Sequence, residues 1–307
     1  MTFSAQIKEE LASVEITSPE CALAECCGMI FFANSTTGNR IKIVTENNNV
    51  ARRASRLLKT LFGFDFDKKI IPESTFKKYN LLIENPTKIA EIFDAFGLVA
   101  DENLSIRLNG ALVESDEARS AFCRGAFLTA GSVASPTSHY HLELVTSHAT
   151  LSREVVALLY ELNLPAKHTL RKSNSIIYFK ESGHIEDFLT RIGAPLSAIE
   201  LMQEKLLKDV RNNTNRQVNC DLANLARAAD AAKIHIAAIN KLYDFGMIET
   251  LSPQLQAAAI LRLRYPDASL SELVALAEDG VGKSGLNHRL KKLVSLAEEL
   301  DKRKDNE

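Results

Sequence analysis

Basic and amide side chains near the C-terminus have the chemistry of a nucleic-acid contact. No Asp or Glu occurs between Gly280 and Ala297. Lysine and arginine pair with phosphates or guanine edges, and asparagine pairs with adenine. The positions that we expect to face outward are Lys283, Ser284, Asn287, His288, Arg289, Lys291 and Lys292. This set predicts a surface that both holds a DNA duplex and reads its bases.

A second polar tract, RNNTNRQVNC, runs from Arg211 to Cys220. Its candidate contact residues are Arg211, Asn213, Asn215 and Arg216. In one interpretation the tract is a polar linker, with Asn219 as the N-cap of the next helix. In the other, its side chains follow a DNA backbone or lie in the minor groove. The residues alone favour neither interpretation.

Three short helical patterns near the C-terminus predict a helix-turn-helix. The first opens at Ser252-Pro253 and stops before Pro266. The second opens at Ser269, with Glu272 three residues later as a capping box. A tight link, residues 279–282, leads into the third, whose apolar stripe is Leu286, Leu290, Leu293, Ala297 and Leu300. This order of elements presents a helix to the major groove of DNA.

The N-terminal two thirds of the chain contains an internal duplication. The segment IKIVT at residues 41–45 recurs about one hundred residues later as LELVT at 142–146. The match continues in register through Arg52 and Arg153. We therefore expect two copies of one unit, over about residues 20–100 and 118–198.

Each copy begins with a helical segment of small residues, at 25–35 and at 122–132. Small side chains let two backbones approach, so these helices are expected to pack on each other at a pseudo-twofold axis. Each copy then follows the order strand pair, helix, strand pair, helix. Alternating strands such as Leu142-Glu143-Leu144 predict sheets with one face on helices and one face open. The predicted class is α+β, followed by an all-α helix-turn-helix domain.

Charge divides the chain into parts. Residues 205–307 hold 16 Lys and Arg against 14 Asp and Glu, whereas residues 1–204 hold 21 against 25. A protein that binds polyanions over its whole surface would be more basic, so any nucleic-acid contact should be local. We expect a duplicated domain at 1–204, a basic linker at 205–217 and a helix-turn-helix domain at 218–307.

Other classes of protein find little support. No run reaches the roughly 20 apolar residues that span a bilayer, so a cytosolic protein without a membrane contact is expected. The five cysteines form no CxxC pair and are expected to be buried, reduced thiols. His139, His141 and His148 should lie in different surroundings, which disfavours a metal site. The segment GVGKSG at 280–285 lacks the spacing and preceding strand of a phosphate-binding loop. No cofactor is expected.

Two C-terminal segments, RNNTNRQVNCDLANLARAADAA and SLSELVALAEDGVGKSGLNHRLKKL, resemble the WhiA family of bacterial sporulation and cell-division regulators. The two repeats are similar to the LAGLIDADG homing-endonuclease scaffold. The resemblance implies a transcription factor that binds double-stranded promoter DNA on the nucleoid, in the cytoplasm. It would act in cell division, chromosome segregation and, where it occurs, sporulation. RNA polymerase, a sigma factor or another regulator are candidate partners.

The resemblance also raises the question of nuclease chemistry. An active LAGLIDADG helix ends in an acid that holds a divalent metal. Aligning the central glycine of the motif with Gly28 places that acid at Ala33, and aligning it with Gly125 places it at Ala130. Alanine offers no oxygen ligand. The resemblance therefore implies a scaffold without catalytic residues and without a metal.

Three functions stay open at this point. The preferred one is a non-enzymatic, sequence-specific DNA-binding regulator whose N-terminal domain serves as a scaffold, a dimerisation surface or a partner surface. The first alternative is a metal-dependent, site-specific DNA endonuclease. The second is an interaction protein whose C-terminal helices grip another protein. Whether the N-terminal domain itself touches DNA, a protein or a ligand is left open.

Overall fold

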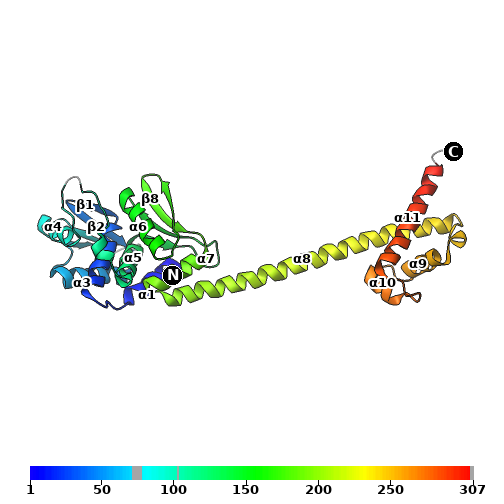
Figure 1. The fold of residues 1–307 in the computed structure, drawn as a ribbon, viewed down its shortest axis with the longest axis horizontal. Helices are drawn as coiled ribbons and strands as arrows, with labels where there is room; N and C mark the ends of the chain where they lie inside the picture. Colours follow the sequence, from blue (N-terminus) through cyan, green and yellow to red (C-terminus); the bar gives the residue numbers. More distant parts are fainter. Residues whose placement is uncertain (71–77, 102–103, 305–307) are drawn as a thin grey trace. The chain divides into compact units, whose positions relative to one another are not determined.

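The fold is described from a computed structural model, in residues 1–70, 78–101 and 104–304. Two compact units are present, residues 1–209 and residues 210–307 (Figure 1). Their boundary lies close to the change in composition near residue 204. Within the described ranges, no helix combines the length and the apolar character needed to cross a bilayer.

The N-terminal unit contains the expected duplication. The described part of the first repeat runs in the order α2 (Pro19–Phe31), β1 (Ser35–Thr37), β2 (Arg40–Thr45), α3 (Asn48–Phe62), β3 (Lys68–Ile70), β4 (Tyr79–Ile83) and α4 (Pro86–Ala95). The second repeat runs in the order α5 (Asp116–Ala130), β5 (Gly131–Val133), β6 (Leu142–Thr146), α6 (Ala149–Glu161), β7 (Lys167–Arg171), β8 (Asn174–Phe179) and α7 (Ser182–Ile192). The α+β prediction is confirmed.

Both sheets have the same topology. The strand order is β1-β2-β4-β3 in one sheet and β5-β6-β8-β7 in the other, with antiparallel pairing throughout. Ile41 pairs with Ile83 and Leu142 pairs with Phe179, and all four side chains are buried. Neighbouring positions such as Lys42 are half-buried. The alternation therefore leaves one face of each sheet against helices and one face open, as expected.

The two small-residue helices pack closely on each other. Gly28 in α2 faces the backbone at Phe122 of α5, and Gly125 in α5 faces the backbone at Glu25 of α2. Each glycine leaves space that the other helix fills. The predicted junction between the repeats is thus formed by α2 and α5.

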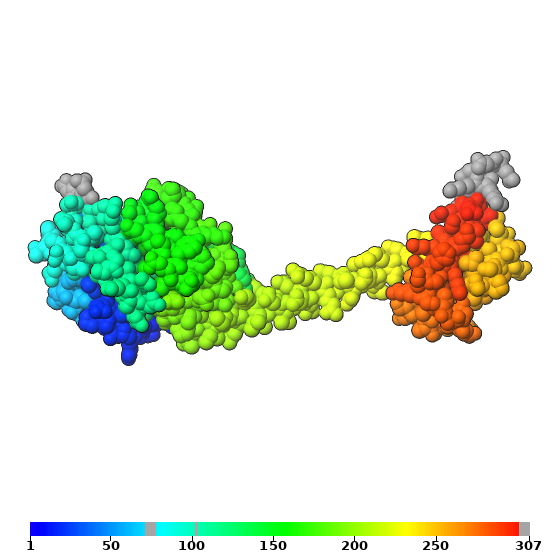
Figure 2. Space-filling model, viewed as in Figure 1, coloured from blue at the N-terminus to red at the C-terminus, as the bar shows by residue number. Residues whose placement is uncertain are grey.

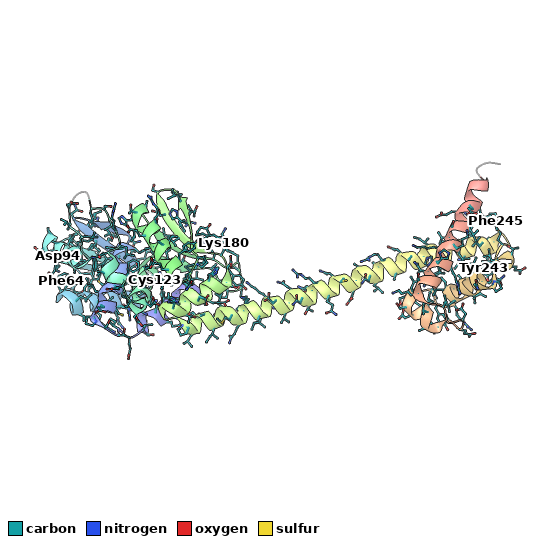
Figure 3. All side chains as sticks on the ribbon, in the orientation of Figure 1. Phe64, Asp94, Cys123, Lys180, Tyr243 and Phe245 are labelled. Carbon is teal, nitrogen blue, oxygen red and sulfur yellow. The ribbon has the colours of Figure 1, made fainter. Side chains whose placement is uncertain are left out.

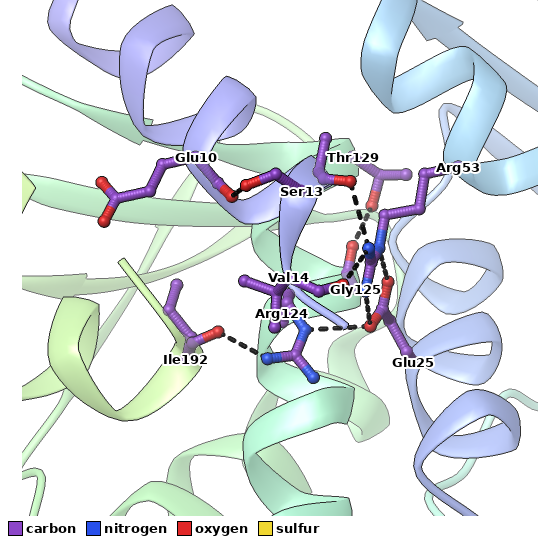
Figure 4. A network of polar contacts seen from close by, with 10 residues as sticks. Glu10, Ser13, Val14, Glu25, Arg53, Arg124, Gly125, Thr129 and Ile192 are labelled. Carbon is purple, nitrogen blue, oxygen red and sulfur yellow. Dashed lines mark hydrogen bonds and ion pairs between the residues drawn. The ribbon is translucent and has the colours of Figure 1, made fainter. Parts of the chain in front are cut away.

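A buried ion network ties this junction together (Figure 4). The carboxylate of Glu25 accepts from Arg53 Nη2 at 2.8 Å and from Arg124 Nε at 2.9 Å. Arg53 comes from α3 of the same repeat, whereas Arg124 comes from α5 of the other. Arg53 Nη1 also donates to the Val14 carbonyl at 2.6 Å, and Arg124 Nη1 donates to the Ile192 carbonyl at 2.8 Å. Buried charges need such partners, because leaving water is costly.

The first helix, α1 (Phe3–Ser13), completes the N-terminal unit. Thr2 caps it, and Phe3, Ile7 and Leu11 are buried along one side, which makes the helix amphipathic. The hydroxyl of Ser4 binds both the amide and the carbonyl of Val133. These two bonds fix helix α1 to strand β5 of the second repeat. A short 3-10 helix, η1 (Gly110–Val113), precedes α5.

The segment expected as a basic linker, residues 205–217, is helical. Helix α8 runs from Pro195 to Asp244, so Asn219 lies inside it and is not an N-cap. No Gly or Pro occurs from residue 196 to residue 245, and nothing else in this stretch breaks a helix. Gly246 follows with φ +66°, a left-handed conformation that commonly ends a helix.

The C-terminal unit has its own hydrophobic core. After α8 come η2 (Ile248–Thr250), α9 (Pro253–Arg264), α10 (Leu270–Leu276) and α11 (Lys283–Lys304). Tyr243 and Phe245 lie at the end of α8, about half exposed (Figure 3). The core residues that are fully buried include Ile239, Leu242, Ala259, Leu273, Leu290 and Leu293.

The cysteines divide into two groups. Cys21, Cys26, Cys27 and Cys123 are buried thiols, as expected. Burial raises the pKa of Cys123 in α5 to about 12, so this thiol stays protonated (Figure 3). Cys220 is exposed on α8, and for this residue the prediction of burial was wrong.

Candidate nucleic-acid interface

The predicted helix-turn-helix is formed by α10, a short turn and α11. The hydroxyl of Ser269 accepts from the Glu272 amide at 3.3 Å, and the Glu272 carboxylate accepts from the Ser269 amide at 2.7 Å. This reciprocal pair is the predicted capping box. Gly280 in the turn has φ +66°, a conformation that favours glycine. The Leu286 amide donates to the Gly282 carbonyl at 3.0 Å, which starts α11.

One side of α11 is fixed to the core of the unit. Leu286, Leu290, Leu293 and Ala297 are buried, at spacings of four, three and four residues. They belong to the same core cluster as Leu273 of α10 and residues 258–259 of α9. This packing determines which side chains of α11 are left for a ligand.

The opposite side of α11 is open to solvent. Ser284, His288 and Lys291 are exposed and follow one another at helical spacing, so they share one face. Lys283 and Lys292 are exposed beside them. The acids of α11 are Glu298, Glu299 and Asp301, and all three lie beyond this face. The exposed set can donate to phosphates and to base edges.

Two predicted residues do not point outward as expected. Asn287 is half-buried, and 20% of the Arg289 side chain is exposed. Arg289 forms an ion pair with Asp279 in the turn, and this hydrogen bond holds the pKa of Asp279 below its usual value. Arg289 is mostly covered because it lies three residues after Leu286 and four before Leu293, which places it at the edge of the buried stripe. The outward placement of Arg289 was wrong.

The second predicted contact lies on α8. Arg211, Asn213, Asn215 and Arg216 are all exposed. Arg211 and Asn215 are one helical turn apart and share a side, whereas Asn213 and Arg216 point elsewhere around the helix. The helical conformation therefore does not bring the four side chains together on one face.

The positions of the nuclease acids lie at the ends of the paired helices. Ala33 comes just after α2 and Ala130 ends α5, and both are half-buried against the core. The neighbouring amide of Asn34 is engaged, because its oxygen accepts from the Val44 amide at 2.6 Å. Among the residues described, no group of three or more His, Cys, Asp or Glu is placed to hold a metal ion.

The expectation of different surroundings holds for His148 but is wrong for His139 and His141, which lie beside each other. The rings of His139 and His141 lie 6.1 Å apart, and His141 Nε2 is 3.4 Å from Glu143. His148 is the N-cap residue of α6, and burial lowers its pKa.

Comparisons with known proteins give the family. Three family models match: a WhiA N-terminal LAGLIDADG-like domain over residues 19–99, a WhiA LAGLIDADG-like domain over 119–211 and a WhiA C-terminal HTH domain over 214–297. A probable cell division protein WhiA from Desulfitobacterium hafniense is 37% identical, over 98% of this chain and 97% of that protein. A relative of the same name from Clostridium botulinum is 36% identical, over 98% and 99%. The chain belongs to the WhiA family.

Solved WhiA structures agree with this fold. The full-length WhiA protein of Thermotoga maritima has a TM-score of 0.58 and 25% identity, over 97% of this chain and 99% of that one. The N-terminal LAGLIDADG domain of a WhiA protein has a TM-score of 0.50 and 24% identity, over 62% and 90%. The WhiA fold thus extends over the whole chain.

Proposed function

We propose that this WhiA-family chain is a sequence-specific regulator of transcription that binds double-stranded promoter DNA through α11. The observation that supports this is the open face of α11, where Ser284, His288 and Lys291 stand together without a carboxylate. A capped helix and a tight turn precede this face, which is the order of a helix-turn-helix recognition helix. Lys283 and Lys292 would position the duplex through its phosphates.

We propose that α8 supplies a second, weaker contact. Arg216 is exposed and one side of the helix around it is polar. Because Arg211, Asn213, Asn215 and Arg216 do not share a face, we expect only some of them to reach a duplex at once. Their role would be to hold the phosphate backbone rather than to read bases.

The dependence of affinity on salt tests the phosphate contacts. Removing one phosphate contact lowers the slope of log affinity against log salt by about 0.9. We expect this change in Lys292→Ala, on any duplex sequence. Lys233→Ala, which removes an exposed lysine of α8 that is not among the proposed contacts, is the matched control and should leave the slope unchanged. Equal slopes for both variants would contradict the proposed site.

The loss of a base contact should lower affinity for the preferred sequence alone, unlike the loss of a phosphate contact. Ser284→Ala and His288→Ala should weaken binding to the preferred duplex by about 1–3 kcal/mol each and leave non-specific binding nearly unchanged. Fluorescence anisotropy with a preferred and a scrambled duplex measures both values. A uniform loss on both duplexes would assign these side chains to the phosphates instead.

We infer that the chain is not a nuclease. The two positions where the LAGLIDADG scaffold needs acids hold Ala33 and Ala130. A hydrocarbon side chain cannot bind the divalent metal that activates water for phosphodiester cleavage. The alternative of a metal-dependent endonuclease would need ligands from other residues.

We infer a role in cell division from the relatives, which are named probable cell division proteins. Chromosome segregation and sporulation are the further processes that we propose. Such a regulator would act in the cytoplasm on the nucleoid, beside RNA polymerase, a sigma factor or another regulator. A genome-wide binding map of the intact chain, compared with one lacking residues 218–307, tests this. Occupancy away from division genes, or occupancy that survives the deletion, would contradict it.

A further inference from the structure

A stripe of uncovered apolar side chains runs along α8 in the C-terminal unit. We define the α8 stripe as Val210, Thr214, Val218, Leu222 and Leu225. The four apolar side chains are 63%, 48%, 59% and 67% exposed in chain order. The space-filling view shows this stretch, coloured yellow-green, with no other element of the C-terminal unit against the face in view (Figure 2).

Successive members of the stripe are four, four, four and three residues apart in sequence, so they lie along one side of the helix. Packing of an apolar face supplies most helical stability in proteins, and the apolar side chains of the α8 stripe lie in water. The one polar member is already satisfied, since the Thr214 hydroxyl donates to the Val210 carbonyl at 3.0 Å. All members of the stripe can therefore leave water without an unpaired polar group.

Two opposite charges border the stripe at matching positions. Arg211 and Asp221 stand five residues before and five residues after Arg216. Four members of the stripe have the same symmetry, because Val210 and Leu222 each lie six residues from Arg216, and Thr214 and Val218 each lie two residues from it. Neither Arg211 nor Asp221 forms an ion pair with another residue in the described part of the chain. The stripe is thus complementary to itself when reversed.

We propose that the α8 stripe binds a second copy of this chain, with the two helices antiparallel and the twofold axis level with Arg216. Thr214 then lies level with Val218 of the second copy, and Arg211 lies level with Asp221 of the second copy. Each contact occurs twice, as in any isologous interface. The interface closes on itself, so it gives dimers and not fibres.

The expected dimer is reversible. A stable interface buries about 800 Å² on each partner, and one helix side of about four turns offers less than this. The dimer should therefore form and dissociate with concentration. Arg216, on the other side of α8, stays available in the dimer. The proposal concerns the free protein and does not depend on DNA binding.

Sedimentation equilibrium of the full chain tests the charge pairing. Arg211→Asp and Asp221→Arg should each weaken the dimer by roughly tenfold, because each places two like-charge pairs in the interface. The double variant Arg211→Asp/Asp221→Arg should restore the dimer. Restoration also excludes misfolding as the cause of the loss. Leu222→Lys should abolish the dimer, whereas Lys233→Ala should not change it.

Cysteine cross-linking tests the register. In a Cys220→Ser background, a mixture of Thr214→Cys and Val218→Cys chains should form a disulfide-linked heterodimer under a mild thiol oxidant. A mixture of Thr214→Cys and Leu225→Cys chains, which is two helical turns out of register, should not. Equal yields from both mixtures, failure of the charge-reversed double variant to recover, or a monomer at every concentration would overturn the proposal.

Discussion

Gly28 and Gly125 each lie against the backbone of the other's helix. A Cβ atom on Gly28 would be 2.1 Å from the carbonyl oxygen of Phe122, and a Cβ atom on Gly125 would be 2.1 Å from the carbonyl oxygen of Glu25. Phe122 and Glu25 each stand three residues before the glycine of their own helix. The same contact is therefore made twice, related by the pseudo-twofold axis of the repeats.

Gly28→Ala and Gly125→Ala should each destabilise the N-terminal unit. The clashing atom is a backbone carbonyl, which cannot rotate away, so the two helices must separate. Overpacking of this kind costs about 1–3 kcal/mol, occasionally more. Urea unfolding followed by circular dichroism measures the loss. Gly183→Ala is the matched control, because a Cβ at this helical position meets no atom within 4 Å.

Glu25→Gln should lower the stability of the N-terminal unit more than the loss of any charge on its surface. The variant leaves Arg53 and Arg124 without their shared counter-ion in a buried site. Breaking a buried pair by removing one partner costs about 3–5 kcal/mol. The exposed Glu84, which pairs with Lys68, is the control, and Glu84→Gln should leave the unfolding midpoint unchanged. Equal effects of the two variants would refute a structural role for the network.

Asp279→Asn should strengthen DNA binding several-fold. The substitution releases the Arg289 guanidinium and removes a negative charge at the start of α11. Glu278→Gln removes the same charge from the neighbouring residue but releases no arginine. Anisotropy titrations with one duplex at fixed salt compare the variants. If both bind equally well, the ion pair does not withhold Arg289 from DNA.

The C-terminal unit should lose stability in mild acid. His235 is buried, and its Nδ1 has no hydrogen-bond partner among the described residues. Burial together with the nearby Arg262 charge lowers its pKa below 6.5. The unfolded chain then binds more protons than the folded one. Stability is therefore complete above pH 6.5 and falls as the pH drops below that value.

This decline is at most about 1.4 kcal/mol per pH unit for one proton. Unfolding curves between pH 7.5 and pH 5.5 measure it. His235→Leu should flatten the dependence on pH, whereas His288→Leu, at an exposed position of α11, should not. A decline that persists unchanged in His235→Leu would show that other groups cause it.

Periodic features of the structure could be predicted from the sequence. The duplicated strands, the capping box at Ser269 and the stop at Gly246 each depend on residues close together in the chain. The pairing of α2 with α5 followed from glycines at equivalent positions of the two repeats. Such signals are local or repeated, so a single sequence contains them.

Other features depend on what surrounds a residue. The asparagines of the tract at 211–220 suggested an N-cap at Asn219, yet without Gly or Pro the helix continues through this residue. Arg289 looked like its basic neighbours, but its ion pair with Asp279 needs the geometry of the turn. The partners of Glu25 come from α3 and α5, which lie far away in sequence. Composition cannot reveal such pairs.

One measurement tests the central claim most directly. The full-length protein is incubated with promoter fragments and magnesium at low salt, and each sample is divided between a native gel and a denaturing gel. A DNA-binding regulator without catalytic carboxylates predicts a retarded band on the native gel and intact strands on the denaturing gel. Nicked or cut strands, or no retardation of any fragment, would contradict the account.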